Sequence, residues 1–147
     1  MRVHAVLLAL VAACQNSQAP AGKLELVDAP AEGAVAPIVA TELARARAAH
    51  KTLVVYVGAD WCEPCVRFHK AAQAGELDAR FGDVRLLVFD LDRDMARLDA
   101  AGYSSDMIPL FALPRDDGTS SKHQIEGGIK GDAAIEQIAI RLRPLLP

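Results

Sequence analysis

The chain has 147 residues, which is enough for one domain with its own hydrophobic core. Its 16 basic and 19 acidic residues give a net charge of −3, and the absence of any basic cluster argues against nucleic-acid binding. No apolar run is long enough to cross a membrane as a permanent helix.

Residues 1–13 have the pattern of a secretory signal peptide, because one basic residue, Arg2, precedes a short apolar run. The run ends in Val-Ala-Ala-Cys at positions 11–14. This ending resembles the bacterial lipobox, which implies cleavage before Cys14 and acylation of that cysteine. An ordinary signal peptide with an unmodified Cys14 is the alternative. Several acyl chains would hold the protein stably on a membrane.

The number of cysteines agrees with lipidation. The sequence has three, and if Cys14 carries lipid, Cys62 and Cys65 remain as one pair. Residues 14–37 are rich in Ala, Pro and Gly and predict a lipidated N-terminus followed by a flexible tether. Within that segment, residues 23–27 are also compatible with an edge strand. We expect residues 38–147 to form the folded domain.

The rest of the chain alternates between helical and strand patterns. Helical composition or spacing predicts helices over residues 39–50, 62–74, 94–101 and 132–142, with a short helix or turn over 76–81. Apolar and β-branched runs predict strands over 52–57, 84–91 and 110–113, and the turn residues at 116–119 predict a hairpin that extends to 125.

The most informative stretch follows the strand predicted at 52–57. It reads Trp61-Cys62-Glu63-Pro64-Cys65, and helical spacing continues after it. This order places Cys62 at or near a helix N-terminus, where the helix dipole stabilises a thiolate. Pro64 suits the first turn of a helix. Two intervening residues allow one helical turn to bring both sulfurs together, so the pair can form a disulfide.

These five residues, placed after an apolar strand, resemble the active site of the thioredoxin superfamily. The Cys-Glu-Pro-Cys motif is similar to that of thioredoxin-like proteins of cytochrome c maturation. The resemblance implies an α/β, thioredoxin-like fold with a central mixed sheet flanked by helices. It also implies that Cys62 attacks a substrate disulfide and that Cys65 resolves the mixed disulfide. Half of a structural zinc site has the same spacing, but no second Cys-x-x-Cys is present.

The resemblance also assigns residues that contact the substrate. Pro109 directly precedes a predicted strand, where the superfamily has a cis-proline, and Ile108 would offer backbone groups to an extended peptide. Trp61 would shield one side of the site. Glu63 either opposes thiolate formation through its charge or is simply a solvated side chain.

One departure from the superfamily concerns the buried carboxylate that cytoplasmic thioredoxins carry six residues before the first cysteine, because Tyr56 stands there. His69 lies four residues after Cys65, on the same helix face, and is a candidate acceptor of the Cys65 proton; a plain surface position is the alternative. Cys62, Cys65 and His69 also have the spacing of a metal site, with His123 available as a further ligand.

We therefore predict a lipid-anchored, extracytoplasmic thiol–disulfide oxidoreductase in a bacterial cell envelope, facing the periplasm or the cell exterior. A reductase of protein disulfides is favoured over an oxidase. We expect protein thiols and disulfides as substrates, an electron donor in the membrane or periplasm, no cofactor, no metal and a monomer. The alternative is a copper-handling thioredoxin-like protein that uses Cys62, Cys65 and His69. Because both cysteines are present, a binding module without turnover is disfavoured.

Overall fold

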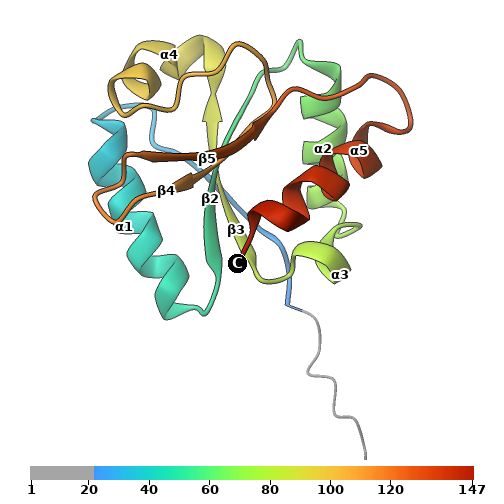
Figure 1. Ribbon diagram of the computed structural model, residues 1–147, viewed down its shortest axis with the longest axis horizontal. Coiled ribbons are helices and arrows are strands. Elements are labelled where there is room, and N and C mark those ends of the chain that lie inside the picture. The colour runs from blue at the N-terminus through green and yellow to red at the C-terminus, as the bar shows by residue number, and fades with distance from the viewer. Residues whose placement is uncertain (1–21) are drawn as a thin grey trace, which may run out of the picture.

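The computed structural model describes residues 22–147, in which helices cover both faces of a β-sheet (Figure 1). The predicted signal peptide, Cys14 and the tether as far as residue 21 lie outside the described residues. Within residues 22–147, no helix combines the length and the hydropathy that a membrane crossing requires.

The sheet has five strands in the order β1-β3-β2-β4-β5. β1, β3 and β2 run parallel to one another, whereas β4 is antiparallel to β2 and β5 is antiparallel to β4. Every residue of β2 except the first is buried, as its apolar sequence predicts for a central strand. The strands are β1 (Glu25–Asp28), β2 (Thr52–Gly58), β3 (Val84–Asp90), β4 (Leu110–Pro114) and β5 (Ser120–Glu126).

Two main helices pack on each face of the sheet (Figure 1). α1 (Val35–Ala48) and α4 (Leu91–Ala100) cover one face, and α2 (Glu63–Gln73) and α5 (Ala134–Leu142) cover the other. A short helix, α3 (Asp78–Phe81), precedes β3, and a 3₁₀ turn (Arg143–Leu145) follows α5. This arrangement confirms the predicted α/β fold with a central mixed sheet.

Three segments meet at one edge of the sheet. β2 and β3 are parallel and end side by side, with Gly58 opposite Asp90. α2 starts shortly after β2, and α4 starts directly after β3, where the Asp90 side chain accepts a hydrogen bond from the Arg93 N–H. Because β4 is antiparallel to β2, it begins at this same edge, with Leu110 opposite Val57. The cysteine pair, the start of α4 and Pro109 are thereby brought together.

The folded domain begins earlier than the predicted boundary at residue 38. β1 pairs with β3, and Leu24 and Ala29 are buried on either side of it. The edge-strand interpretation of this segment is therefore correct, and the assignment of residues 24–37 to a flexible tether is wrong. Its Ala- and Pro-rich composition conceals a four-residue strand, which is too short to give a clear alternating pattern.

Candidate active site

Cys62 and Cys65 form a disulfide at the N-terminus of α2. Cys62 is the N-cap residue of this helix, and its sulfur accepts a hydrogen bond from the Cys65 N–H, with an N···S distance of 3.3 Å. Pro64 lies in the first turn, where no intrahelical donor is needed. Because a helix N-terminus favours negative charge, the same geometry would stabilise a Cys62 thiolate after reduction of the disulfide.

Both cysteines are largely shielded from solvent. The exposed fraction is 6% for Cys62 and 2% for Cys65. A nucleophilic cysteine at a helix N-terminus is expected to be exposed; Cys62 is instead nearly buried, although it is the more accessible of the two. The reason is packing, since Ala59, Leu91 and Ile108 lie against the pair.

A cavity lies beside each cysteine. The Cys62 groove, of about 350 Å³, is lined among others by Trp61, Cys62, Pro64, Met107 and Ile108. The Cys65 cavity, of about 470 Å³, is lined among others by Tyr56, Cys65, His69, Lys70 and Arg93. The two cysteines therefore border different cavities, Cys62 the groove and Cys65 the cavity that His69 also lines.

Trp61 stands at the rim of the Cys62 groove with 66% of its surface exposed. Its indole N–H donates a hydrogen bond to Asp92, in the first turn of α4, with an N···O distance of 2.9 Å. This contact holds the indole ring beside the Cys62 groove, with most of the ring surface exposed to solvent.

The peptide bond between Ile108 and Pro109 is cis, as the resemblance implied. Ile108 packs against the cysteine pair and lines the Cys62 groove. Pro109 is buried and does not line the groove; its carbonyl accepts a hydrogen bond from the Gly127 N–H at 2.9 Å. Met107, 57% exposed, packs over Gly127, so Met107 and Ile108 together form one wall of the Cys62 groove.

Glu63 is partly exposed and is held by two hydrogen bonds. Its carboxylate accepts hydrogen bonds from the Arg67 side chain, at 2.9 Å, and from the Gly131 N–H, at 3.0 Å. The hydrogen bond from Arg67, followed by that from Gly131, lowers the pKa of Glu63 below its ordinary value. Glu63 thus ties the start of α2 to the loop between β5 and α5, and its charge is paired.

Tyr56 lies on β2, six residues before Cys62, at the position where cytoplasmic thioredoxins carry a buried carboxylate. Its hydroxyl donates a hydrogen bond to the Cys65 carbonyl at 3.2 Å, and its ring packs against Phe68 and Phe111. Burial raises the pKa of Tyr56 far above its ordinary value, so the group is neutral. Gly58 lies against the same hydroxyl, since a Cβ there would approach it to 2.7 Å. The site therefore carries a neutral hydrogen-bond donor at this position.

His69 lies one turn beyond Cys65, is partly buried and lines the Cys65 cavity. Among residues 22–147, no three His, Cys, Asp or Glu side chains are grouped so that they would hold a metal ion. His123 is exposed on β5 and lines neither of the two cavities beside the cysteines. The described part of the chain therefore offers no assembled site for the copper-handling alternative.

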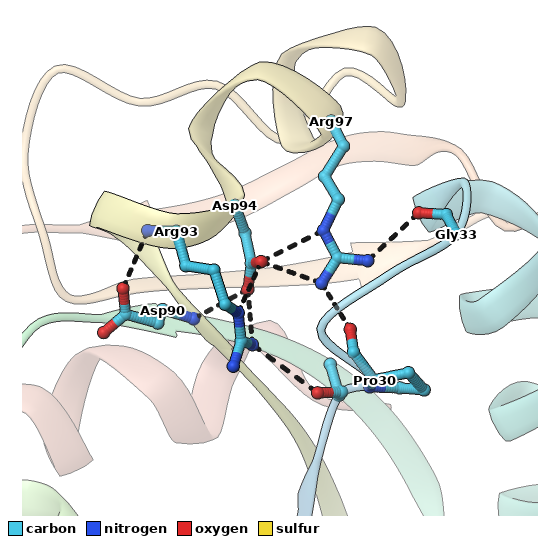
Figure 2. A network of polar contacts seen from close by, with 7 residues as sticks. Pro30, Gly33, Asp90, Arg93, Asp94 and Arg97 are labelled. Atoms are coloured by element: carbon cyan, nitrogen blue, oxygen red, sulfur yellow. Dashed lines mark hydrogen bonds and ion pairs between the residues drawn. The ribbon is translucent and has the colours of Figure 1, made fainter.

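A buried charged cluster supports the start of α4 and was not predicted from the sequence (Figure 2). Asp94 is fully buried and accepts hydrogen bonds from the side chains of Arg93 and Arg97 and from the Asp90 N–H, at 2.8 to 3.0 Å. Both guanidinium groups also donate hydrogen bonds to backbone carbonyls in the segment between β1 and α1. Arg93 donates to the carbonyl of Ala29, and Arg97 donates to those of Pro30 and Gly33.

Burial acts to raise the pKa of Asp94, but the hydrogen bonds from Arg93 and Arg97 outweigh it, so the net pKa lies below the ordinary value. The spacing of Asp94 and Arg97 is readable in the sequence as an i, i+3 pair. The distant carbonyl partners are not, because they depend on how the chain folds back.

No family model matches this sequence, and no curated protein matches it. The structure is similar to that of a mutant thioredoxin from Halobacterium salinarum NRC-1, with 21% identity, a TM-score of 0.51, and coverage of 86% of this chain and 91% of that chain. It is also similar to thioredoxin O1 from Arabidopsis thaliana in the oxidised state, with 18% identity, a TM-score of 0.48, and coverage of 84% and 95%, respectively.

The fold is therefore thioredoxin-like, as the resemblance of the active-site residues implied. Combined with the Cys62–Cys65 disulfide at the N-terminus of α2, this fold supports thiol–disulfide oxidoreductase activity in general. Protein thiols and disulfides are the substrates that such a cysteine pair suggests.

Proposed function

We propose that this protein is an extracytoplasmic thiol–disulfide oxidoreductase that reduces disulfides in other proteins. The observation that carries the proposal is the placement of the cysteine pair. Cys62 caps α2 and lines a groove beside Ile108, whereas Cys65 is more deeply buried and lines the other cavity. This arrangement gives the two sulfurs unequal access, which is what a nucleophile and a resolving cysteine require.

The reaction starts from the reduced pair. The Cys62 thiolate attacks one sulfur of a substrate disulfide, that S–S bond breaks, and the released substrate thiolate takes a proton. A mixed disulfide now joins Cys62 to the substrate. Cys65 loses its proton and attacks the Cys62 sulfur, so the mixed disulfide breaks and the second substrate sulfur leaves as a thiol. The substrate has gained two electrons, and the Cys62–Cys65 disulfide must be reduced again by a dithiol donor in the membrane or periplasm.

We assign His69 as the acceptor of the Cys65 proton. Both residues line the same cavity, and Tyr56 is a neutral donor whose hydroxyl is already bonded to the Cys65 carbonyl. An imidazole can accept a proton directly or through one water molecule. His69→Gln should slow release of the mixed disulfide and leave the first attack by Cys62 unchanged.

The reductive direction is supported by the electrostatics around Cys62. A strong oxidant needs a highly stabilised thiolate in its reduced form. Here the dipole of α2 and the Cys65 N–H favour the thiolate, but Glu63, the next residue, is anionic and engages the guanidinium of Arg67. Stabilisation of the thiolate is therefore moderate, as a reductase requires.

The extracytoplasmic location and the lipid anchor rest on the sequence before residue 22. The apolar run that ends in Cys14 and the odd number of cysteines support them. An anchored chain would hold the folded domain close to the membrane, where a membrane-bound donor could reach it.

The proposal is tested with the full chain, extracted in detergent, in an insulin reduction assay driven by dithiothreitol. We expect wild-type protein to accelerate insulin precipitation and Cys62→Ser to lose this activity altogether. A wild-type rate equal to that of dithiothreitol alone would refute the proposed function.

A further inference from the structure

A third cavity lies next to the Cys62 groove, on the α4 side of Ile108. It has a volume of about 640 Å³ and lies between α4, the segment before β4, and β5. Leu91, Ser105, Asp106 and Ile108 line both this cavity and the Cys62 groove. The two hollows therefore share one wall, and a chain that crosses Ile108 can reach both.

The lining of this cavity combines an apolar floor with negative charge. Val57, Leu98 and Leu110 form part of the floor, and Met95, 52% exposed, stands at the rim. The charged residues that line it are Asp99, Asp106 and Glu126, and no Lys, Arg or His of residues 22–147 lines it. We call it the acidic pocket.

The carboxylates of the acidic pocket can accept hydrogen bonds from a ligand. None of its three carboxylates is among the ion pairs formed within residues 22–147. The Oε1 atom of Gln124, which also lines the pocket, is buried and has no hydrogen-bond partner among the described residues. The three carboxylates therefore favour a ligand that brings N–H groups.

Because the two cavities share a wall, they can accept neighbouring residues of one extended peptide. Such a peptide advances about 3.3 Å per residue, so residues one or two places from a cysteine lie within about 7 Å along the chain. When the cysteine of a substrate reaches Cys62, a side chain close to it in sequence therefore passes over Ile108 and into the acidic pocket. Lys and Arg match this pocket, since each has an apolar stem and a cationic end that donates several hydrogen bonds.

We propose that the acidic pocket selects substrates in which Lys or Arg lies within two residues of the cysteine that Cys62 attacks. This inference rests on the proposed function and adds its substrate class. Asp99, Asp106 and Glu126 are the residues that determine the preference, and Ile108 is the ridge that the peptide crosses between the two hollows.

The test uses disulfide-linked dimers of short Gly-rich peptides that contain one cysteine. Arg, Gln or Glu flanks the cysteine directly in one series and at the second position in another. Pre-reduced full-length protein is mixed with each peptide, and oxidation is followed by the fluorescence of Trp61, the one tryptophan in the sequence. Each rate is divided by the rate of the same peptide with dithiothreitol, which removes differences in intrinsic reactivity.

We expect the Arg peptides to react about tenfold faster than the Glu peptides at low salt, with a smaller ratio at high salt, because exposed charges are screened. The triple variant Asp99→Asn, Asp106→Asn, Glu126→Gln should reduce this ratio to about one. The charge reversal Asp99→Lys, at an exposed helix position, leaves Asp106 and Glu126 anionic and should give a ratio between those of wild type and the triple variant. Glu76→Gln, an exposed carboxylate outside the pocket, is the matched control and should retain the wild-type ratio.

Equal normalised rates for all peptides, or an unchanged ratio in the triple variant, would overturn the substrate preference alone. A neutral disulfide, 2,2′-dithiodipyridine, separates this result from a failure of the proposed function. If wild-type protein reduces neither this compound nor any peptide, the proposed function and the substrate preference fall together.

Discussion

Neutralising Asp94 should destabilise the fold in a pH-dependent manner. The carboxylate is fully buried and is held by both guanidinium groups of Arg93 and Arg97. Asp94→Asn retains the shape of the side chain but removes the charge. Its amide N–H groups would also face the guanidinium N–H donors of Arg93 and Arg97. Removal of one partner from a buried ion pair costs about 3 to 5 kcal/mol. We expect Asp94→Asn to lower the free energy of unfolding by about 3 kcal/mol, the lower end of this range, because Arg93 is partly exposed and can be solvated.

The sign of the pH dependence follows from the lowered pKa of Asp94. A carboxyl group whose pKa is lower in the folded state contributes stability above its unfolded pKa of about 3.9, and this contribution is lost as the pH falls through the folded value. The difference in unfolding free energy between wild type and Asp94→Asn should therefore be complete at pH 7 and should shrink below about pH 4.

Urea unfolding of the oxidised protein at pH 7 and pH 3 measures this difference. In thermal unfolding at pH 7, we expect the midpoint of Asp94→Asn to be lower by about 6 to 12 °C. Asp99→Asn, an exposed change on the same helix, is the control and should stay within about 0.5 kcal/mol of wild type. A loss below about 1 kcal/mol at pH 7, or an equal loss at both pH values, would refute the reasoning.

Three further predictions concern the cysteines and His69. Cys65→Ser should trap covalent substrate complexes whereas Cys62→Ser traps none, and alkylation of reduced wild type at mildly acidic pH should label Cys62 first; equal labelling would contradict the assignment of the nucleophile. Intact-mass analysis of membrane-extracted protein should show a chain that starts at acylated Cys14, and a soluble chain with an unmodified Cys14 would disprove lipidation. Reduced protein should bind copper or zinc weakly, with little change in His69→Ala; tight binding that this variant abolishes would favour the metal-handling function.

The elements that the sequence predicts correctly are those whose residue pattern lies within a short stretch of the chain. The strand, the Trp-Cys-Glu-Pro-Cys stretch and the helix after it lie within a short span, so their order alone places Cys62 at the N-terminus of α2. The cis bond at Pro109 followed from resemblance rather than from spacing. Periodicity also identified the other helices and strands, with shifts at their ends. The start of α4, at Leu91 rather than residue 94, is an example of such a shift.

The features of the site that the sequence does not predict depend on contacts between residues far apart in the chain. Glu63 reaches Gly131 across 68 positions, and Arg97 reaches Gly33 across 64. Ile108 covers Cys62 only because β4 runs antiparallel to β2. Charged residues on a helix usually face water, so the complete burial of Asp94 has no signature in the local pattern.

The reduction potential of the Cys62–Cys65 pair tests the central claim most directly. Full-length protein is equilibrated in dithiothreitol buffers of graded potential, and the fraction reduced is read from the fluorescence of Trp61. We predict a two-electron transition close to the value for thioredoxin, about −270 mV, because the Cys62 thiolate is stabilised only moderately. A value near that of the strong periplasmic oxidants, about −120 mV, would contradict the assignment of this protein as a reductase.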